Sequence, residues 1–188
     1  MKILLTGHTK GIGQFLLGAL SAEGHVVIGV SRSNGYDISL KQDRDILLTA
    51  YSEVDVFINN AHAGTAQCEL ALGMWNQWHT AGRHGYIINV GSKASYDHAL
   101  RPQPTMYDCE KSALRNISID LSRLDPLIRV THLAIGYVDT DRNKDNPWPK
   151  LAQVSVIDIV KWLLSQPSYL QIREICCEAR TDEVPNGI

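Results

Sequence analysis

The sequence predicts a three-layer α/β fold, in which helices cover both faces of a doubly wound parallel sheet of about seven strands. Short apolar segments alternate with segments of helical apolar spacing, and this alternation is typical of a parallel sheet covered on both faces. The first apolar segment also runs through three glycines directly into a helical pattern. The length of 188 residues allows one domain with a full core and leaves little room for a second.

The expected elements follow one another without a repeat, a low-complexity tract or a linker. Residues 2–6 form the first strand, and apolar residues at helical spacing predict a helix over 12–23 that Gly24 ends. Further strands are expected over 26–30, 36–38, 54–59, 86–90, 128–133 and 172–176. Further helices are expected over 40–52, 106–124 and 155–165. The segment 141–150 is expected to be a loop, with a lid and a rigid surface turn as equal alternatives.

The composition is that of a globular chain, because 44% of residues are hydrophobic, 20% are charged and the net charge is −2. This charge favours neither nucleic acid nor a membrane surface as partner. Strand residues begin at position 2, so we expect no signal peptide, and no apolar run is long enough to cross a bilayer. The cysteines predict a reduced, cytoplasmic setting and no metal site, since they lack zinc-ligand spacing. They are Cys68, Cys109, Cys176 and Cys177.

The glycine-rich turn is the first feature that carries chemistry. Gly7, Gly11 and Gly13 follow the first strand with the spacing G-x-x-x-G-x-G, and the next helix opens among them. Glycine permits positive φ angles and removes the Cβ that would keep a ligand at a distance. The free N–H groups and the positive dipole end of a helix favour an anion there. The turn therefore predicts a phosphate cradle for a nucleotide cofactor, against the alternative of an ordinary loop.

A tyrosine and a lysine four residues apart form the second feature. Tyr107 and Lys111 lie on one face of the expected helix, where the ammonium favours the phenolate of its neighbour. Such a pair can pass a proton to or from a substrate oxygen. Ser92 ends a buried strand, at the edge where doubly wound sheets bind their ligands. Taken singly, these residues also fit an exposed amphipathic helix and a turn serine.

Together these motifs resemble the short-chain dehydrogenase/reductase family over nearly the whole chain. Residues 6–13 (TGHTKGIG) are similar to its TGxxxGIG turn, and residues 59–61 (NNA) to the start of its NNAG motif. Residues 89–92 (NVGS) resemble the strand that carries its catalytic serine, and residues 107–111 (YDCEK) its YxxxK motif. Residues 136–140 (GYVDT) resemble its PG-x-x-x-T segment. The five motifs stand in the family's order, which makes the joint signal strong.

The resemblance implies a role for each residue. Tyr107 would be the general acid in reduction and the general base in oxidation. Lys111 would favour the phenolate form of Tyr107 and would hydrogen-bond the nicotinamide ribose. Ser92 would orient the substrate oxygen. Residues 1–188 would form a single NAD(P)-binding domain of the Rossmann type. The cofactor-binding residues implied are Gly7, Thr9, Lys10, Gly11, Ile12, Gly13, Ser31, Arg32, Ser33, Asp37, Ile38, Asn60, Ala61, Val90, Tyr107, Lys111, Gly136, Val138 and Thr140.

The end of the second expected strand distinguishes NAD(H) from NADP(H). An acidic residue there would accept hydrogen bonds from the ribose 2′-hydroxyl, whereas a basic residue would pair with a 2′-phosphate. Residues 31–33 are Ser-Arg-Ser, without an acid, and Lys10 adds a second positive charge within the glycine turn. We therefore expect NADP(H) to be preferred over NAD(H). The alternative is that Arg32 and Lys10 are solvated surface cations.

The main departure from the family is a short crossover. About 20 residues separate Gly64 from Gly85, whereas family members use a longer segment with a long helix. That helix normally supplies a catalytic asparagine, and Asn76, the only asparagine here, has no assigned role. The helix also forms much of the family's oligomer interface, so the family's usual dimer or tetramer is not implied here, and a homo-oligomer is left open. Trp75 and Trp78 cap the core in the favoured interpretation and form a different interface in the other.

Smaller departures change single positions. His62 replaces the glycine of NNAG and is interpreted as lining the cofactor pocket, with a catalytic role as the alternative. Ile135 replaces the proline of PG-x-x-x-T, which loosens that turn. Ser95 competes with Ser92 for the serine role, because the spacing to Tyr107 is slightly long. Three histidines without metal-ligand spacing are interpreted as surface residues in loops: His79, His84 and His98.

The expected function is that of an NADP(H)-dependent oxidoreductase acting on a small-molecule carbonyl/alcohol pair. The alternative is a nucleotide-binding sensor or scaffold that has kept the fold and lost efficient catalysis. The short crossover favours this alternative, and the intact Ser92, Tyr107 and Lys111 oppose it. Substrate specificity would reside in residues 93–106 and 137–150 and in the short crossover, where no pattern encodes one ligand.

Overall fold

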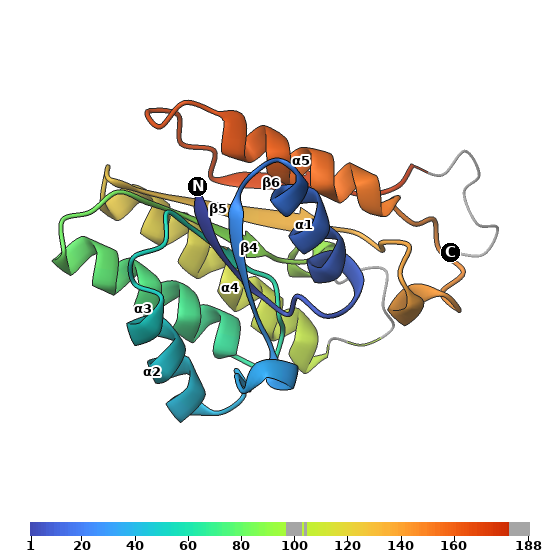
Figure 1. The fold of residues 1–188 in the computed structure, drawn as a ribbon. Coiled ribbons are helices and arrows are strands. Elements are labelled where there is room, and N and C mark those ends of the chain that lie inside the picture. Colours follow the sequence, from blue (N-terminus) through green and yellow to red (C-terminus); the bar gives the residue numbers. More distant parts are fainter. Residues whose placement is uncertain (97–102, 104, 181–188) are drawn as a thin grey trace.

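One parallel sheet organises the computed structural model, which describes residues 1–96, 103 and 105–180. Its strands lie in the order β2-β1-β3-β4-β5-β6, each parallel to its neighbours (Figure 1). Because the strands are parallel, their carboxyl ends meet at one edge, where doubly wound sheets bind their ligands. The bounds are β1 (Lys2–Thr6), β2 (Val26–Val30), β3 (Val56–Asn59), β4 (Gly85–Val90), β5 (Ile128–Ile135) and β6 (Glu174–Cys177).

Five helices connect the strands in the described part of the chain, and all except α3, whose bounds were not predicted, lie close to the expected bounds. They are α1 (Gly11–Ala22), α2 (Lys41–Ala50), α3 (Ala66–Thr80), α4 (Met106–Leu124) and α5 (Gln153–Ser165). Short 3₁₀ helices follow three of the strands: η1 (Arg32–Asn34) after β2, η2 (Lys93–Ser95) after β4 and η3 (Asp141–Asn143) after β5. The expected class, a three-layer α/β fold with a doubly wound parallel sheet, is confirmed.

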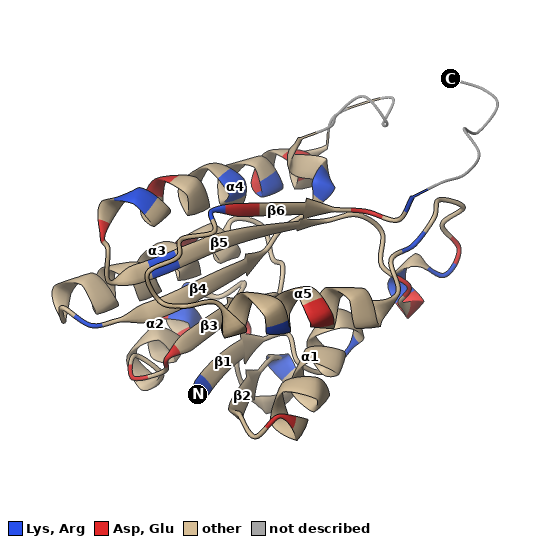
Figure 2. Ribbon diagram, turned by 90° about the horizontal axis from the view of Figure 1, so that it is seen from above, with Lys and Arg blue, Asp and Glu red and all other residues tan. Residues whose placement is uncertain are grey.

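Two apolar cores lie on either side of the sheet. The helices α1 and α5 cover one face, and α2, α3 and α4 cover the other (Figures 1 and 2). Successive residues of one strand serve opposite cores, as Leu5 and Leu4 of β1 do, and likewise Ile58 and Phe57 of β3. These four side chains are fully buried. Burial of both faces explains why the strands are apolar throughout instead of alternating.

The expected strand over 36–38 is wrong, and the sheet has six strands within the described residues. The backbone N–H of Asp37 donates to the Asp43 carboxylate at 2.7 Å, and the Asp37 carboxylate accepts from the N–H and the hydroxyl of Ser39. Local bonds of this kind compete with strand pairing for the backbone donors. The segment therefore turns into the start of α2 and leaves β2 at the edge of the sheet.

The short crossover after β3 still contains a full helix, α3, of 15 residues. Trp78 is fully buried and Trp75 is 7% exposed, both within the core between α3 and the sheet. The indole N–H of Trp78 donates to the Ser52 carbonyl at 2.8 Å, which ties α3 to the turn after α2. The interpretation of both tryptophans as core residues is confirmed.

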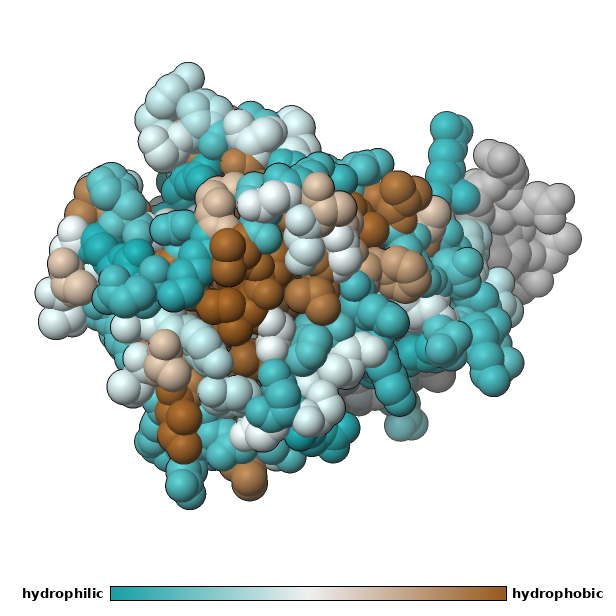
Figure 3. All heavy atoms as spheres, in the orientation of Figure 1, coloured by the Kyte–Doolittle hydropathy of each residue, from teal (hydrophilic) through white to brown (hydrophobic). Residues whose placement is uncertain are grey.

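The surface is mixed in character. Figure 2 shows basic and acidic residues interspersed along α4 and α5. Figure 3 shows an apolar area near the middle of one face, surrounded by mainly hydrophilic residues. Across the ranges that the structure describes, no helix has both the length and the apolar character required to cross a membrane.

Candidate active site

Loops that follow β1, β3, β4 and β5 meet at the carboxyl edge of the sheet, and α4 begins there as well. The five motifs of the sequence lie on these loops and on the first turns of α4. They are separated by up to about 130 residues in the chain, yet the parallel topology brings them to one edge. This edge is the candidate active site.

Each of the three glycines in the turn occupies a position that disfavours a side chain or faces a neighbouring loop. Gly7 and Gly11 have φ angles of +74° and +53°, which side chains disfavour. A Cβ on Gly13 would lie 2.1 Å from the Gly7 carbonyl oxygen, so this position admits no side chain. A Cβ on Gly11 would lie 3.7 Å from the Thr140 methyl group, so the loop after β5 faces the turn. Among the described residues no side chain caps α1, and the turn fits a phosphate in shape and dipole.

The segment after β3 is fastened to the glycine turn. The Thr6 hydroxyl oxygen accepts from the backbone N–H groups of Asn60 and Ala61, both at 2.9 Å. The Asn60 side-chain amide donates back to the Thr6 carbonyl oxygen at 3.0 Å. A Cβ on Gly7 would lie only 3.0 Å from the Ala61 Cβ. Asn60 and Ala61, both predicted at the cofactor, therefore form a wall of the cradle.

The two basic residues predicted to determine the preference for NADP(H) over NAD(H) lie on the surface. Arg32 begins η1 directly after β2 and is exposed, and Lys10 in the glycine turn is exposed as well. The hydroxyl oxygens of Ser31 and Ser33 lie 2.8 Å apart. No acidic residue occupies this turn. The local chemistry is therefore basic and hydroxylic, as the sequence predicts.

Asp37 and Ile38 differ in accessibility. Ile38 is 7% exposed and packs in the core with α2 and α3. Asp37 is half-buried, and its hydrogen bonds from Ser39, reinforced by the charge of Arg32, lower its pKa. Contact of these two residues with a nucleotide base stays a prediction.

Other residues predicted at the cofactor follow the same edge in different settings. Thr9 is exposed, whereas Ile12 is partly buried and packs against the core beneath α1 and α5. The Gly136 N–H donates to the Cys177 carbonyl at 2.8 Å, which continues the β5–β6 pairing. Val138 is 1% exposed, so its side chain serves the core.

The loop over 141–150 is braced at its base. The Leu151 N–H donates to the Tyr137 carbonyl at 2.8 Å, and the Asp139 N–H donates to the Leu151 carbonyl at 2.9 Å. The Asn143 side-chain amide donates to the Val138 carbonyl at 2.9 Å. These bonds hold the base of the loop and are compatible with both a lid and a rigid turn.

The two serines hold their hydroxyls differently. The Ser92 hydroxyl oxygen accepts from the Ala94 N–H at 3.1 Å, which leaves its proton available for donation. The Ser95 hydroxyl donates its proton to the Ser92 carbonyl at 2.7 Å, and Ser95 is 8% exposed. Ser92 therefore fits the substrate-orienting role better than Ser95.

Tyr107 and Lys111 lie in the first two turns of α4, which begins with a capping box of Thr105 and Asp108. The Lys111 Nζ atom lies 5.5 Å from the centroid of the Tyr107 ring. Lys111 is only 3% exposed. Burial, reinforced by the positive charge of Arg142, lowers its pKa to about 8. An ammonium so deeply buried requires acceptors from the protein.

Gln67, in the first turn of α3, supplies such an acceptor, and the sequence analysis missed it. Its Oε1 accepts from Lys111 Nζ at 2.6 Å, while its Nε2 donates to the Asn59 and Val90 carbonyls at 2.8 and 3.1 Å. Lys111 Nζ also donates to the Val90 carbonyl at 3.4 Å. Gln67 is 2% exposed. The available signal was a polar residue at the start of the short crossover.

A row of buried polar side chains supports Gln67. Asn59 Nδ2 donates to the Gln67 carbonyl at 2.8 Å and to Asn89 Oδ1 at 2.9 Å. Asn89 Nδ2 then donates to the Ser118 hydroxyl oxygen at 2.9 Å. Asn59, Asn89 and Ser118 are all fully buried. The row runs from β3 through β4 to α4 and so connects the strand ends with the helix that carries Tyr107 and Lys111.

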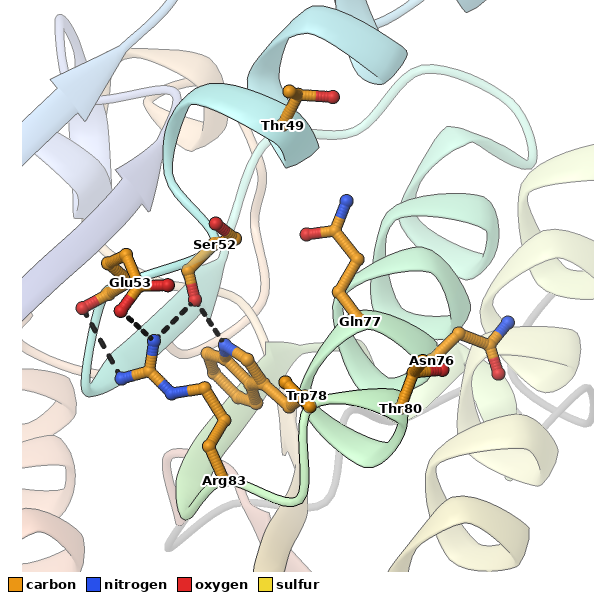
Figure 4. Close-up of a pocket in the computed structure, with 9 residues that line it drawn as sticks. Thr49, Ser52, Glu53, Asn76, Gln77, Trp78, Thr80 and Arg83 are labelled. Carbon is orange, nitrogen blue, oxygen red and sulfur yellow. Dashed lines mark hydrogen bonds and ion pairs between the residues drawn. The ribbon is translucent and has the colours of Figure 1, made fainter.

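Asn76 lies far from this network. It is exposed and lines a hollow beside the turn after α2 and the carboxyl-terminal part of α3 (Figure 4). The hollow flanks the amino ends of β3 and β4, at the opposite edge of the sheet from Lys111. Arg83 there donates to the Ser52 carbonyl at 2.7 Å. Asn76 therefore does not replace the family's catalytic asparagine.

The four histidines considered in the sequence analysis lie in different settings. His62 lies at the site, with its ring against Tyr107. His79 is exposed at the end of α3, not in a loop, and its Nδ1 lies 2.6 Å from the Asp125 carboxylate. His84 is exposed in the following loop, and His98 lies outside the described residues. Within the described ranges no cluster of His, Cys, Asp or Glu could hold a metal ion.

No family model matches the chain. An uncharacterized oxidoreductase of Staphylococcus epidermidis is 22% identical over 221 residues, with 92% of this chain and 94% of that protein covered. The aligned length exceeds the 188 residues of this chain, so the relative carries insertions. An uncharacterized oxidoreductase of Staphylococcus saprophyticus is 28% identical over 96 residues. That match spans 48% of this chain and 40% of the relative, less than half of either.

Solved structures share the fold over almost the whole chain. A short chain dehydrogenase from Burkholderia cenocepacia in complex with NADP matches with a TM-score of 0.76 and 23% identity, covering 93% of this chain and 86% of that one. An alcohol dehydrogenase from Thermococcus sibiricus complexed with 5-hydroxy-NADP matches with a TM-score of 0.76 and 19% identity over 99% of both chains. A 4-hydroxyisoleucine dehydrogenase mutant complexed with NADH and succinate has a TM-score of 0.80 at 15% identity, covering 95% and 97%.

These likenesses define the class of fold. The chain has the fold of the short-chain dehydrogenases/reductases, with a Rossmann-type parallel sheet between two helical layers. The fold that this resemblance implies is thereby confirmed.

Proposed function

We propose that this protein is an NADP(H)-dependent oxidoreductase of the short-chain dehydrogenase/reductase type, acting on a carbonyl/alcohol pair. The observation that carries the proposal is the contact between Lys111 and Gln67, because an ammonium is held in a dry setting beside Tyr107 and on the same sheet edge as the glycine cradle. A purely structural helix gains nothing from burying a cation that has only neutral hydrogen-bond acceptors among the described residues. The cofactor-bound relatives support a nicotinamide as the ligand.

The bound nicotinamide would supply or accept the hydride, and the protein would hold the substrate and move the proton. Ser92 would donate its free proton to the substrate oxygen and orient it. The Tyr107 hydroxyl would give its proton to that oxygen in reduction and take it back in oxidation. Lys111 would favour the phenolate through its charge, and Gln67 would fix the direction of the ammonium.

The preference for NADP(H) is proposed from Arg32 and Lys10. Both are exposed, so a 2′-phosphate would bind them without displacing an internal partner. We expect Arg32→Ser and Lys10→Ser each to weaken NADPH binding by about tenfold and to leave NADH binding unaltered. Arg123→Ser, at an exposed position near the other end of α4, is the matched control. Equal losses for both cofactors would contradict the assignment.

Replacement of Tyr107 by phenylalanine tests the reaction itself. We expect turnover of carbonyl substrates to fall by about a hundredfold or more, because only the proton donor is lost. NADPH binding, followed by nucleotide fluorescence, should persist. A turnover that Tyr107→Phe leaves intact would contradict the proposed proton donor. Binding without turnover in the wild-type protein would favour the sensor or scaffold alternative.

A further inference from the structure

The acceptors that Lys111 finds within the described part of the chain cannot carry a proton onward. Its Nζ donates to the Gln67 amide oxygen at 2.6 Å and to the Val90 carbonyl oxygen at 3.4 Å, and the residue is 3% exposed. Neither an amide nor a backbone carbonyl releases or accepts protons near neutral pH. Repeated turnover nevertheless requires Tyr107 to exchange its proton with solvent after every cycle. A route to solvent that does not run through these acceptors needs another group beside Tyr107.

His62 and Glu110 lie on another side of Tyr107. The His62 ring meets the Tyr107 ring edge to face, with centroids 5.0 Å apart and an interplanar angle of 73°. The His62 Nε2 atom lies 2.8 Å from Glu110 Oε2. Glu110 follows Tyr107 by three residues, so both project from the same side of α4. The side chains of His62 and Glu110 are 24% and 17% exposed, so the pair extends from the buried site to water.

The charged surroundings keep His62 able to accept a proton. The titratable and charged groups that face it are Tyr107, Glu110 and Lys111 of α4 and Arg142 of η3. Burial and the charge of Lys111 lower the pKa of His62, while the Glu110 carboxylate opposes them. The imidazole is therefore mainly neutral at pH 7, and Glu110 is positioned to stabilise the imidazolium when it forms.

We propose that the His62–Glu110 pair is the relay through which Tyr107 exchanges its proton with solvent. In reduction the Tyr107 hydroxyl gives its proton to the substrate oxygen and becomes a phenolate. An imidazolium at His62 then returns one proton to that phenolate, and His62 regains one from water with Glu110 as counter-ion. Oxidation runs the same transfers in reverse. The relay rests on the proposed oxidoreductase function and assigns His62 a role beyond lining the cofactor pocket.

Single-turnover and steady-state kinetics separate this relay from a structural role. The first turnover uses the proton already on Tyr107, and only later turnovers need His62. With NADPH and 4-nitrobenzaldehyde as probe, we expect His62→Asn to keep its single-turnover rate and to lose steady-state turnover by about tenfold or more. Added imidazole should restore the steady state. Since His79 pairs with Asp125 as His62 pairs with Glu110, His79→Asn is the matched control and should leave both rates unaltered.

Two measurements do not depend on turnover. The NADPH affinity of His62→Asn, followed by nucleotide fluorescence, separates a loss of cofactor binding from a loss of the relay. In the cofactor-free protein, Glu110→Gln should lower the pKa of His62 in an NMR titration, because the carboxylate that favours the imidazolium is lost. Equal losses in both kinetic phases, or an unaltered steady state in His62→Asn, would overturn the relay alone. Failure of the wild-type protein to bind either nicotinamide would instead overturn the proposed function, and the relay with it.

Discussion

The side-chain amide oxygen of Gln67 lies 2.6 Å from the ammonium nitrogen of Lys111, and both residues are almost completely buried. The amide nitrogen of the same glutamine is bound to two backbone carbonyls, so its orientation is determined by the sheet. One side chain thus connects the ends of β3 and β4 with the lysine of α4. The short crossover between β3 and β4 therefore supplies one side chain, Gln67, to the candidate site.

Removal of that amide should affect both stability and activity. We expect Gln67→Leu to lower the free energy of unfolding by about 2–4 kcal/mol, because a buried ammonium and two carbonyls lose a partner. Turnover should fall by about tenfold or more, because the ammonium is no longer held in place. Gln77→Leu on the same helix is the matched control, since its Oε1 has no hydrogen-bond partner in the described part of the chain. Urea unfolding and steady-state kinetics of both variants provide the comparison, and equal effects would contradict the account.

The lowered pKa of Lys111 predicts opposite pH dependences for activity and stability. Lys111 holds its proton below pH about 8 in the folded protein, so activity should fall as the pH rises through that value. The unfolded chain keeps this proton up to about pH 10.5, so the free energy of unfolding should rise between these pH values. The rise should be absent in Lys111→Met. Pulse proteolysis or urea unfolding at pH 7 and 9.5 measures this rise in the free energy of unfolding. A wild-type protein that loses stability over this range relative to Lys111→Met would contradict the lowered pKa of Lys111.

The cradle predicts different outcomes for two glycines of one helix. Gly13→Ala places a Cβ 2.1 Å from the Gly7 carbonyl, so the turn must move and NADPH binding should be lost. A Cβ on Gly18 would meet no atom within 4 Å, so Gly18→Ala should stabilise α1 by about 0.5–1 kcal/mol and leave binding unaltered. Nucleotide fluorescence and thermal unfolding of both variants test this. Normal binding by Gly13→Ala would show that the turn does not hold the cofactor.

His132 predicts a loss of stability in acid. It is fully buried in β5, and burial lowers its pKa from 6.5 to about 4. The unfolded chain takes up this proton first, so stability should fall as the pH drops from about 6.5 toward 4, by about 3 kcal/mol in total. His132→Val removes the titrating group and should show a correspondingly smaller acid loss in urea unfolding. Identical pH dependences in the two proteins would contradict this assignment.

The fold was predictable to the extent that it depends on local patterns. Apolar strands, helix periodicity and the stop at Gly24 gave most elements near their observed bounds. The strand expected over 36–38 failed because carboxylates of Asp37 and Asp43 take up nearby backbone donors, a contact that no apolar pattern reveals. The helix in the short crossover was not specified, since its length and position depend on burial of Trp75 and Trp78 under the sheet.

The site was predictable where a motif carries its own spacing. The glycine turn and the pair of Tyr107 and Lys111 lie at the predicted edge of the sheet. Gln67 and Glu110 escaped prediction because their roles come from contacts between residues 44 and 48 positions apart in the chain. A single sequence indicates residue types and local spacing, and only the tertiary fold brings Gln67 to Lys111.

The most direct test of the central claim is a parallel titration of the purified protein with NADPH and NADH, followed by nucleotide fluorescence. The account predicts tight NADPH binding and much weaker NADH binding, because the proposal assigns Arg32 and Lys10 to the 2′-phosphate, beside the cradle of Gly7, Gly11 and Gly13. Binding of neither nucleotide would contradict the proposed oxidoreductase function.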